Sequence, residues 1–293
     1  MLVTQLWFAP FLLLFFNTFN NLSLCHEIAD FSECGVSGFD PFSMQPEHNK
    51  LGLLNHIYRG LPIVDDKSLP WMATVLQNEF DALQNKTKFK PICTATIIGP
   101  RHFLTALHCL EDGQKNSEYR LSYGAAQSSK QRHSFPIKSV KYPPNAKYLT
   151  FTDVLKNNRA EIIKADLAII KSKQAIIFSP HVRPICLFSN AQDMPKDDPI
   201  NAIEKRLYEY HLADKICVVP EPSVTEPGDS GSPLLSKIGQ YNWVQVGVLH
   251  GGNDKRCVPN DLYSTKGLYS AYTPIDCDWI ADVTDGEVKC RGW

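Results

Sequence analysis

The stretch CTATIIGPRHFLTALHC, residues 93–109, carries the clearest structural signal in this chain. Two short apolar runs, Ile92–Ile98 and Phe103–Ala106, are separated by glycine and proline, a pattern that is typical of two β-strands joined by a turn. Two cysteines bracket the stretch, and His108 stands directly before the second of them. These residues therefore predict two strands followed closely by a histidine.

The same alternation of short apolar runs with Pro, Gly, Asn and Asp continues from Leu69 onward. Helical periodicity is scarce: the clearest helix is predicted at Asp278–Val283 and a weaker one at Ala202–Tyr210. Many short strands with irregular connections favour an all-β sandwich or barrel. The further candidate strands are Trp71–Leu76, Leu167–Ile170, Pro233–Leu235 and Trp243–Leu249.

Two polar stretches, Gln77–Pro91 and Pro143–Lys164, are predicted to be inserted surface loops. The first contains the sequon Asn85-Lys86-Thr87, so Asn85 is a predicted glycosylation site. Residues 26–56 are also polar and irregular, and this segment is predicted to be a propeptide.

The N-terminus has the pattern of a targeting segment. Leu6–Phe16 is an apolar run of 11 residues, which is too short for a membrane-spanning helix of about 20 residues but suits a secretory signal. Ser23-Leu24-Cys25 provides small residues before a cleavage point, so residues 1–25 are predicted to be a signal peptide and the protein to be secreted. A membrane anchor is the alternative.

Composition disfavours several classes of partner. The formal net charge is −1, and no basic cluster indicates capture of nucleic acid or of anionic lipid. The sequence contains neither H-E-x-x-H nor paired C-x-x-C motifs, so a metal-binding module is disfavoured, and no metal or cofactor is expected. Of nine cysteines, removal of residues 1–25 leaves eight, an even number that suits an oxidising compartment.

Three motifs contain a histidine, an aspartate and a serine in that order along the chain: residues 93–109, ADLAII at 165–170 and PGDSGSP at 227–233. They resemble the T-A-A-H-C, D-I-A-L and G-D-S-G-G-P signatures of chymotrypsin- and trypsin-like serine proteases, including a divergent trypsin-like group found in nematodes. The order His, Asp, Ser is also that of this family. The resemblance implies a peptidase domain at 57–293, built from two packed six-stranded antiparallel β-barrels.

The resemblance assigns catalysis to His108, Asp166 and Ser230. A serine hydroxyl needs a positioned base, and imidazole titrates near neutrality, so His108 would take the proton of Ser230 and return it to the leaving amine. Asp166 would orient the ring and stabilise the imidazolium. Gly228 lacks a β-carbon, which allows a turn that points its N–H, with that of Ser230, at the oxyanion. Protein or peptide substrates and a proteinaceous inhibitor are the expected partners.

Disulfides are expected at four pairs of positions. The resemblance implies Cys93–Cys109, which would hold the loop of His108, and Cys34–Cys186. Parity and proximity suggest Cys217–Cys257 and Cys277–Cys290.

Members of this family are made as precursors, and a new N-terminus pairs with the aspartate before the nucleophile. Ile57-Tyr58-Arg59-Gly60 resembles that N-terminus, and Asp229 would be its partner. His56 departs from the Arg or Lys that usually precedes the cleaved bond.

The primary specificity pocket also departs from the trypsin pattern. Val224 stands where trypsin-like members have an acidic residue, so a preference for Lys or Arg is disfavoured unless Glu226 enters the pocket. His250-Gly251-Gly252 resembles the S-W-G wall with its aromatic residue lost, and Gly252 is the second expected pocket residue.

Spacing leaves a second interpretation open. Asp166 and Ser230 are 64 positions apart, whereas chymotrypsin-type enzymes have roughly 90, and the missing length falls between Cys186 and Cys217. The second barrel is therefore expected to be incomplete. The alternative function is a catalytically inactive protease homologue that binds a partner through the former substrate face.

Overall fold

The computed structural model describes residues 33–38, 57–58, 67–82, 85–110, 115–125, 130–144, 146, 165–189, 211–212, 215–218, 224–225, 227–238, 242–252 and 270–291. All of them belong to one unit, Phe31–Trp293. The predicted signal peptide, most of the predicted propeptide and the helix expected at Ala202–Tyr210 lie outside the described residues. No helix in the described ranges is both long and apolar enough to cross a membrane.

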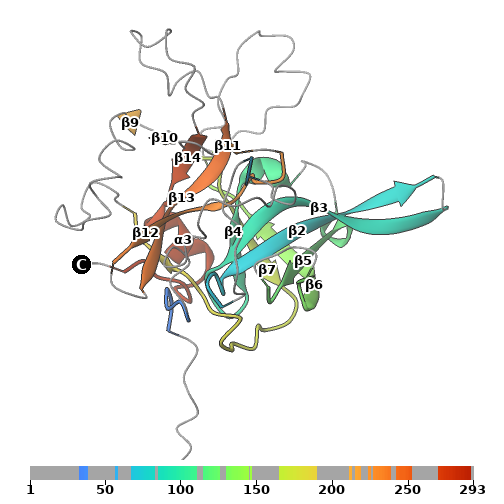
Figure 1. Ribbon diagram of the computed structural model, residues 1–293, viewed down its shortest axis with the longest axis horizontal. Coiled ribbons are helices and arrows are strands. Elements are labelled where there is room, and N and C mark those ends of the chain that lie inside the picture. The colour runs from blue at the N-terminus through green and yellow to red at the C-terminus, as the bar shows by residue number, and fades with distance from the viewer. Residues whose placement is uncertain are drawn as a thin grey trace, which may run out of the picture. The chain divides into compact units, whose positions relative to one another are not determined.

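Six antiparallel strands form a closed barrel in the order β2-β3-β4-β7-β6-β5 (Figure 1). Closure pairs the edges that an open sheet would expose. Apolar and β-branched residues recur along these strands and fill the interior of the barrel. Four of them have no exposed surface: Ile97, Phe103, Leu104 and Ile170. The strands are β2 Met72–Asp81, β3 Lys86–Ile97, β4 His102–Thr105, β5 Tyr119–Tyr123, β6 His133–Lys141 and β7 Ala168–Ser172.

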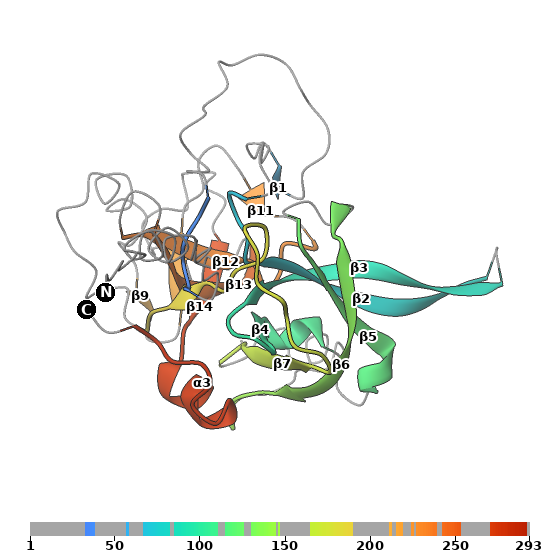
Figure 2. The same cartoon turned by 90° about the horizontal axis from the view of Figure 1, so that it is seen from below.

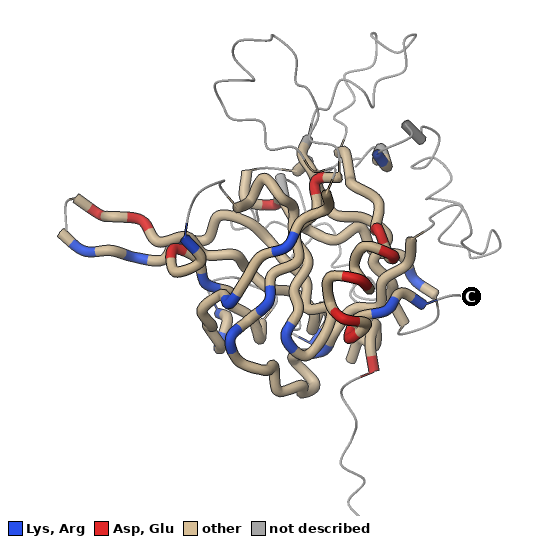
Figure 3. The backbone as a smooth tube through the Cα atoms, turned by 180° about the vertical axis from the view of Figure 1, so that it is seen from behind, with Lys and Arg blue, Asp and Glu red and all other residues tan. Residues whose placement is uncertain are grey.

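The prediction of a loop at Gln77–Pro91 is wrong, because β2 and β3 continue through most of this stretch as a hairpin that projects from the barrel (Figure 2). Acidic residues lie on one strand and basic residues on the other (Figure 3), and Lys90 pairs with Glu79 at 2.8 Å. The polar sequence thus provides cross-strand ion pairs on an exposed hairpin. Asn85 lies at its turn with a φ of 49°. Most of the other predicted loop, Pro143–Lys164, lies outside the described residues.

A second sheet of six strands remains open, so the expectation of an incomplete second barrel is confirmed. Its order is β12-β13-β14-β10-β9, and β8 pairs with β13 in parallel. The strands are β8 Cys186–Leu187, β9 His211–Leu212, β10 Lys215–Val218, β12 Pro233–Lys237, β13 Trp243–Gly252 and β14 Ser270–Pro274.

The barrel and the second sheet are joined by buried polar contacts as well as by apolar packing. Thr96 of β3 donates its hydroxyl hydrogen to Gln245 Oε1 of β13 at 2.7 Å, and both side chains are fully buried. Buried polar groups of this kind require a partner, because leaving one unsatisfied costs about 1–3 kcal/mol. This contact fixes the position of β13 relative to the barrel.

The described residues contain one α-helix, α3 at Cys277–Val283, which confirms the helix predicted at Asp278–Val283. Asp276 precedes it as N-cap, and its carboxylate accepts a hydrogen bond from the N–H of Trp279 at 3.0 Å. The expected disulfide Cys277–Cys290 is present and closes the segment that contains the helix.

Residues 33–38 of the predicted propeptide are attached to the second sheet. The expected disulfide Cys34–Cys186 is present, and the N–H of Trp243 donates to the carbonyl of Gly35 at 2.8 Å. Gly35 has a φ of 76°, and a β-carbon there would lie 2.2 Å from the Trp243 oxygen, so this position requires glycine. Cleavage after His56 would therefore leave this segment covalently bound to the domain.

Candidate active site

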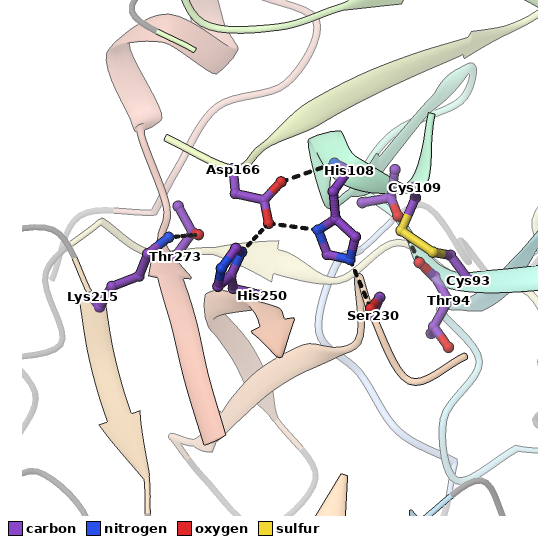
Figure 4. Close-up of polar contacts among 10 residues, drawn as sticks. Cys93, Thr94, His108, Cys109, Asp166, Lys215, Ser230, His250 and Thr273 are labelled. Carbon is purple, nitrogen blue, oxygen red and sulfur yellow. Dashed lines mark hydrogen bonds and ion pairs between the residues drawn. A yellow bond between two sulfur atoms is a disulfide. The ribbon is translucent and has the colours of Figure 1, made fainter. Parts of the chain in front are cut away.

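His108 lies in a 3-10 turn, η1 at Leu107–Cys109, directly after β4. Leu107 and Cys109 are buried and hold the turn against the core. The disulfide Cys93–Cys109, implied by the family resemblance, is present and ties the turn to β3 (Figure 4). The imidazole itself keeps 29% of its surface exposed, so its ring remains accessible.

Asp166 stands two residues before β7, and its side chain is fully buried. Its Oδ1 accepts a hydrogen bond from the backbone N–H of His108 at 3.0 Å, and its Oδ2 lies 2.7 Å from His108 Nδ1. Burial alone would raise the pKa of Asp166. Hydrogen bonds from His108 and His250 outweigh that effect and hold the pKa well below its usual range, so the buried carboxylate is charged.

Ser230 lies in the turn before β12, with its Oγ 2.8 Å from His108 Nε2. The turn is fixed from both sides: the N–H of Thr94 in β3 donates to the carbonyl of Ser230, and the N–H of Gly231 donates to Leu249 of β13. Gly231 has a φ of 84°, and a β-carbon on it would lie 2.1 Å from the Thr94 oxygen. A side chain at position 231 would therefore displace Ser230.

The structure thus brings His108, Asp166 and Ser230 into one continuous chain of hydrogen bonds (Figure 4). The barrel contributes the histidine and the aspartate, and the turn before β12 of the second sheet contributes the serine. A hydroxyl, an imidazole and a buried carboxylate in this order form the arrangement that activates serine for nucleophilic attack.

A protein-family model described as Trypsin matches residues 63–205. The match contains His108 and Asp166 together with the strands of the closed barrel, and it ends before Ser230. Over these residues the chain is similar to the trypsin family.

Gly228, the residue expected to contribute to an oxyanion hole, has a φ of 104°. That backbone conformation is in the region that favours glycine. Thr94 Oγ1 donates to the carbonyl of Gly228 at 3.2 Å and so ties the turn to β3. The contribution of the Gly228 and Ser230 N–H groups to oxyanion binding stays a prediction.

Two predicted features, the new N-terminus and the pocket, meet in a small two-stranded sheet. β1 Ile57–Tyr58 is antiparallel to β11 Val224–Thr225, with Ile57 opposite Thr225 and Tyr58 opposite Val224. Asp229 is buried, with 4% of its surface exposed. In the uncleaved chain Ile57 has no free ammonium, so its pairing with Asp229 stays a prediction.

Other predicted site features are described only in part. Gly252 ends β13 opposite Ser270 of β14. Cys257 and Glu226 lie outside the described residues, so the Cys217–Cys257 disulfide and the alternative role of Glu226 both stay predictions.

His250 is the site residue whose role the sequence did not indicate. The family resemblance places it only in the pocket wall, but its Nδ1 lies 2.5 Å from Asp166 Oδ2. Its ring meets that of His108 edge to face, with centroids 5.6 Å apart. The contact joins residues 84 positions apart, and only the unusual histidine in the wall segment marked it in the sequence.

The same three side chains offer ligand atoms for a cation. Ligand atoms of His108, Asp166 and His250 lie within 4.8 Å of one another. Both histidines present Nδ1 to the carboxylate at hydrogen-bond distance, so a cation would have to replace those hydrogen bonds. The observed distances fit a proton-sharing cluster better than ligand–ligand separations around a metal.

Proposed function

We propose that this chain is a secreted serine endopeptidase, made as a precursor, that hydrolyses peptide bonds through an acyl-enzyme intermediate. The observation that carries the proposal is the hydrogen-bonded chain from Ser230 Oγ through His108 to Asp166. The match of residues 63–205 to the trypsin-family model, which suggests protein substrates, supports it independently.

The proposed reaction uses each group in a separate step. Ser230 Oγ attacks the substrate carbonyl while its proton passes to His108 Nε2, and Asp166 stabilises the resulting imidazolium. The oxyanion is bound by the N–H groups of Gly228 and Ser230. His108 then gives its proton to the leaving amine, and a water molecule, deprotonated in the same way, hydrolyses the acyl-enzyme and frees Ser230.

The open second sheet favours the alternative function, a catalytically inactive homologue that binds a partner. Two features weigh against that alternative. Ser230 is held from both sides by backbone hydrogen bonds, and Asp166 is buried as a charged group with several hydrogen bonds. A protein that only bound a partner would gain nothing from a buried charge, which is costly to desolvate.

Labelling with a fluorophosphonate probe tests the proposal directly. We expect the secreted and processed protein to become labelled at Ser230, because the probe reacts only with an activated serine hydroxyl. His108→Ala should abolish labelling even though it leaves the serine in place. A folded, processed protein that stays unlabelled would instead favour the inactive homologue.

If the protein is active, we expect cleavage after uncharged side chains and rejection of Lys and Arg. Val224 stands at the sequence position that the family resemblance assigns to the base of the pocket. Next to it, Thr225 Oγ1 lies 3.2 Å from Ser270 Oγ of β14, so the polar groups described there are neutral hydroxyls. Desolvating a substrate ammonium without a charged partner costs several kcal/mol, and each 1.36 kcal/mol is about tenfold in rate.

Profiling the processed protein on a peptide library checks this specificity. Strong cleavage after Arg or Lys that Glu226→Gln abolishes would show that Glu226 supplies the missing charge, and the prediction would then be wrong.

A further inference from the structure

One carboxylate oxygen is shared by two histidines. Asp166 Oδ2 lies 2.7 Å from His108 Nδ1 and 2.5 Å from His250 Nδ1. Asp166 is fully buried, while the two imidazoles keep 29% and 22% of their surface exposed. The two rings can therefore exchange protons with solvent, whereas the carboxylate between them cannot be hydrated.

The hydrogen-bond roles follow from the chemistry of the groups. An ionised carboxylate only accepts, so Nδ1 of each ring must carry a hydrogen and donate it. In the neutral form each histidine therefore has an unprotonated Nε2. For His108 that is the tautomer required to accept the proton of Ser230, whose Oγ lies 2.8 Å away.

A local irregularity of β13 occurs where His250 contacts Asp166. The register of β13 against β14 shifts between Leu249 and Gly251, and His250 is the residue between them. Such a bulge re-aims a side chain relative to the regular alternation of a strand. The backbone of this strand thus places the His250 ring beside the triad.

We propose that His250 is a positioning residue of the triad and a second proton-binding group that regulates it. Neutral His250 holds the Asp166 carboxylate in line with His108. Protonated His250 neutralises the Asp166 charge and slows the reaction. The inference rests on the proposed peptidase function and adds a pH-dependent control of the same site.

The physical reason is competition for one negative charge. In the transition state His108 becomes an imidazolium, and Asp166 stabilises it. A single carboxylate compensates only one such cation, and a second imidazolium with its centroid 5.6 Å away repels the first. Proton binding by His250 and proton transfer to His108 therefore oppose each other.

Other titratable groups lie on the elements packed around His250. Lys215 of β10 is buried, and its Nζ donates to Thr273 Oγ1 of β14 at 2.8 Å (Figure 4). Tyr272 of β14 is neutral at physiological pH, because burial and then the charge of Asp229 raise the pKa of its phenol. Asp229 itself is buried in the turn before β12. In this set His108 and His250 are the imidazoles, the side-chain type that commonly binds and releases a proton in proteins.

Two substitutions separate positioning from proton binding. His250→Asn keeps an amide N–H within similar reach of Asp166 and cannot titrate near neutrality. His250→Leu keeps the approximate size and removes the donor. The measurements are kcat and KM of the processed enzyme on one peptide across pH, with active sites counted by fluorophosphonate titration.

We expect His250→Asn to keep kcat within about fivefold of the wild type at alkaline pH. The asparagine amide still donates a hydrogen bond to the Asp166 carboxylate, so this charged group keeps its donors. On the acid side of the pH profile, kcat of His250→Asn should decrease as a single proton binds. The midpoint of this decrease should lie about 0.3 pH unit below that of the wild type, because one of two equal proton-binding sites has been removed. His250→Leu should lower kcat by roughly 10²-fold with KM little changed, the loss expected for a displaced catalytic group.

An acid limb identical in the wild type and His250→Asn would overturn the regulatory role. A wild-type kcat in His250→Leu would overturn the positioning role. An NMR titration of the His108 ring in Ser230→Ala, with and without His250→Asn, requires no activity. If His250→Asn shifts this titration but the wild-type protein shows no turnover of substrate, the proposed function is wrong and the coupling stands. If the wild-type protein is active but no shift occurs in the Ser230→Ala background, only this inference is wrong.

Discussion

Replacement of Ser230 by alanine is expected to lower kcat of the processed enzyme by about 10⁶-fold, the loss seen when a triad nucleophile is removed. The substitution removes the oxygen that attacks the substrate, while the N–H groups expected to bind the oxyanion remain. His108→Ala should cost about as much, and the double substitution little more, because the groups act as a unit. The measurement is steady-state turnover of a peptide ester or amide by purified, processed protein.

Ser232→Ala provides the matched control. Ser232 lies two residues after Ser230 in the same turn, and its backbone N–H donates to the carbonyl of Asp229 at 2.9 Å, a bond that alanine retains. This variant should keep nearly all activity. If Ser230→Ala retained more than about one part in a hundred of the wild-type rate, far above the residual catalysis expected without a nucleophile, another group would have to be the nucleophile.

Local motifs singled out His108, Asp166 and Ser230, which the folded chain joins by hydrogen bonds. His108 follows a strand whose residues Phe103 and Leu104 are strongly apolar, and Asp166 precedes another such strand. Short apolar runs of this kind indicate where a strand begins and ends, and hence where a polar residue emerges from it. The family resemblance then supplied what spacing alone could not: that the ends of three distant strands meet.

Strands that bury few residues were not predicted. In β6 most residues are exposed or half-buried, and Ile137 is the one buried member, so no apolar run marks it. The β2–β3 hairpin is held by backbone pairing and by ion pairs such as Lys90–Glu79, and its sequence has the composition of a loop. Strand pairing of this type depends on partners elsewhere in the chain, which a local pattern does not contain.

The role of His250 was missed for a related reason. Leu249 before it is buried, and a regular alternation places His250 on the opposite face of the strand without indicating what it contacts there. The register shift between Leu249 and Gly251 re-aims it, and this bulge exists only in the pairing of β13 with β14. The distance from His250 to Asp166 is therefore a property of the folded sheet and not of either motif.

Asp166→Asn is expected to lower kcat by about 10⁴-fold, through the hydrogen-bonding pattern rather than through size. Three donors converge on this carboxylate: the His108 N–H on Oδ1, and Nδ1 of His108 and of His250 on Oδ2. An amide has one accepting end. If its NH₂ faces the rings, each ring must accept at Nδ1, so its proton moves to Nε2, and His108 can no longer take the proton of Ser230. If its NH₂ faces the His108 N–H, two donors oppose each other in a fully buried site.

Both orientations also remove the negative charge that stabilises the imidazolium, so neither rescues the reaction. The measurement is kcat of the processed variant, with Asp278→Asn as control, since Asp278 is exposed on the first turn of α3 and away from the hydrogen-bonded chain. The control should match the wild type. If Asp166→Asn stayed within about tenfold of the wild type, the tautomer of His108 would not depend on Asp166, and the histidine would have to be oriented by Ser230 and the buried η1 turn alone.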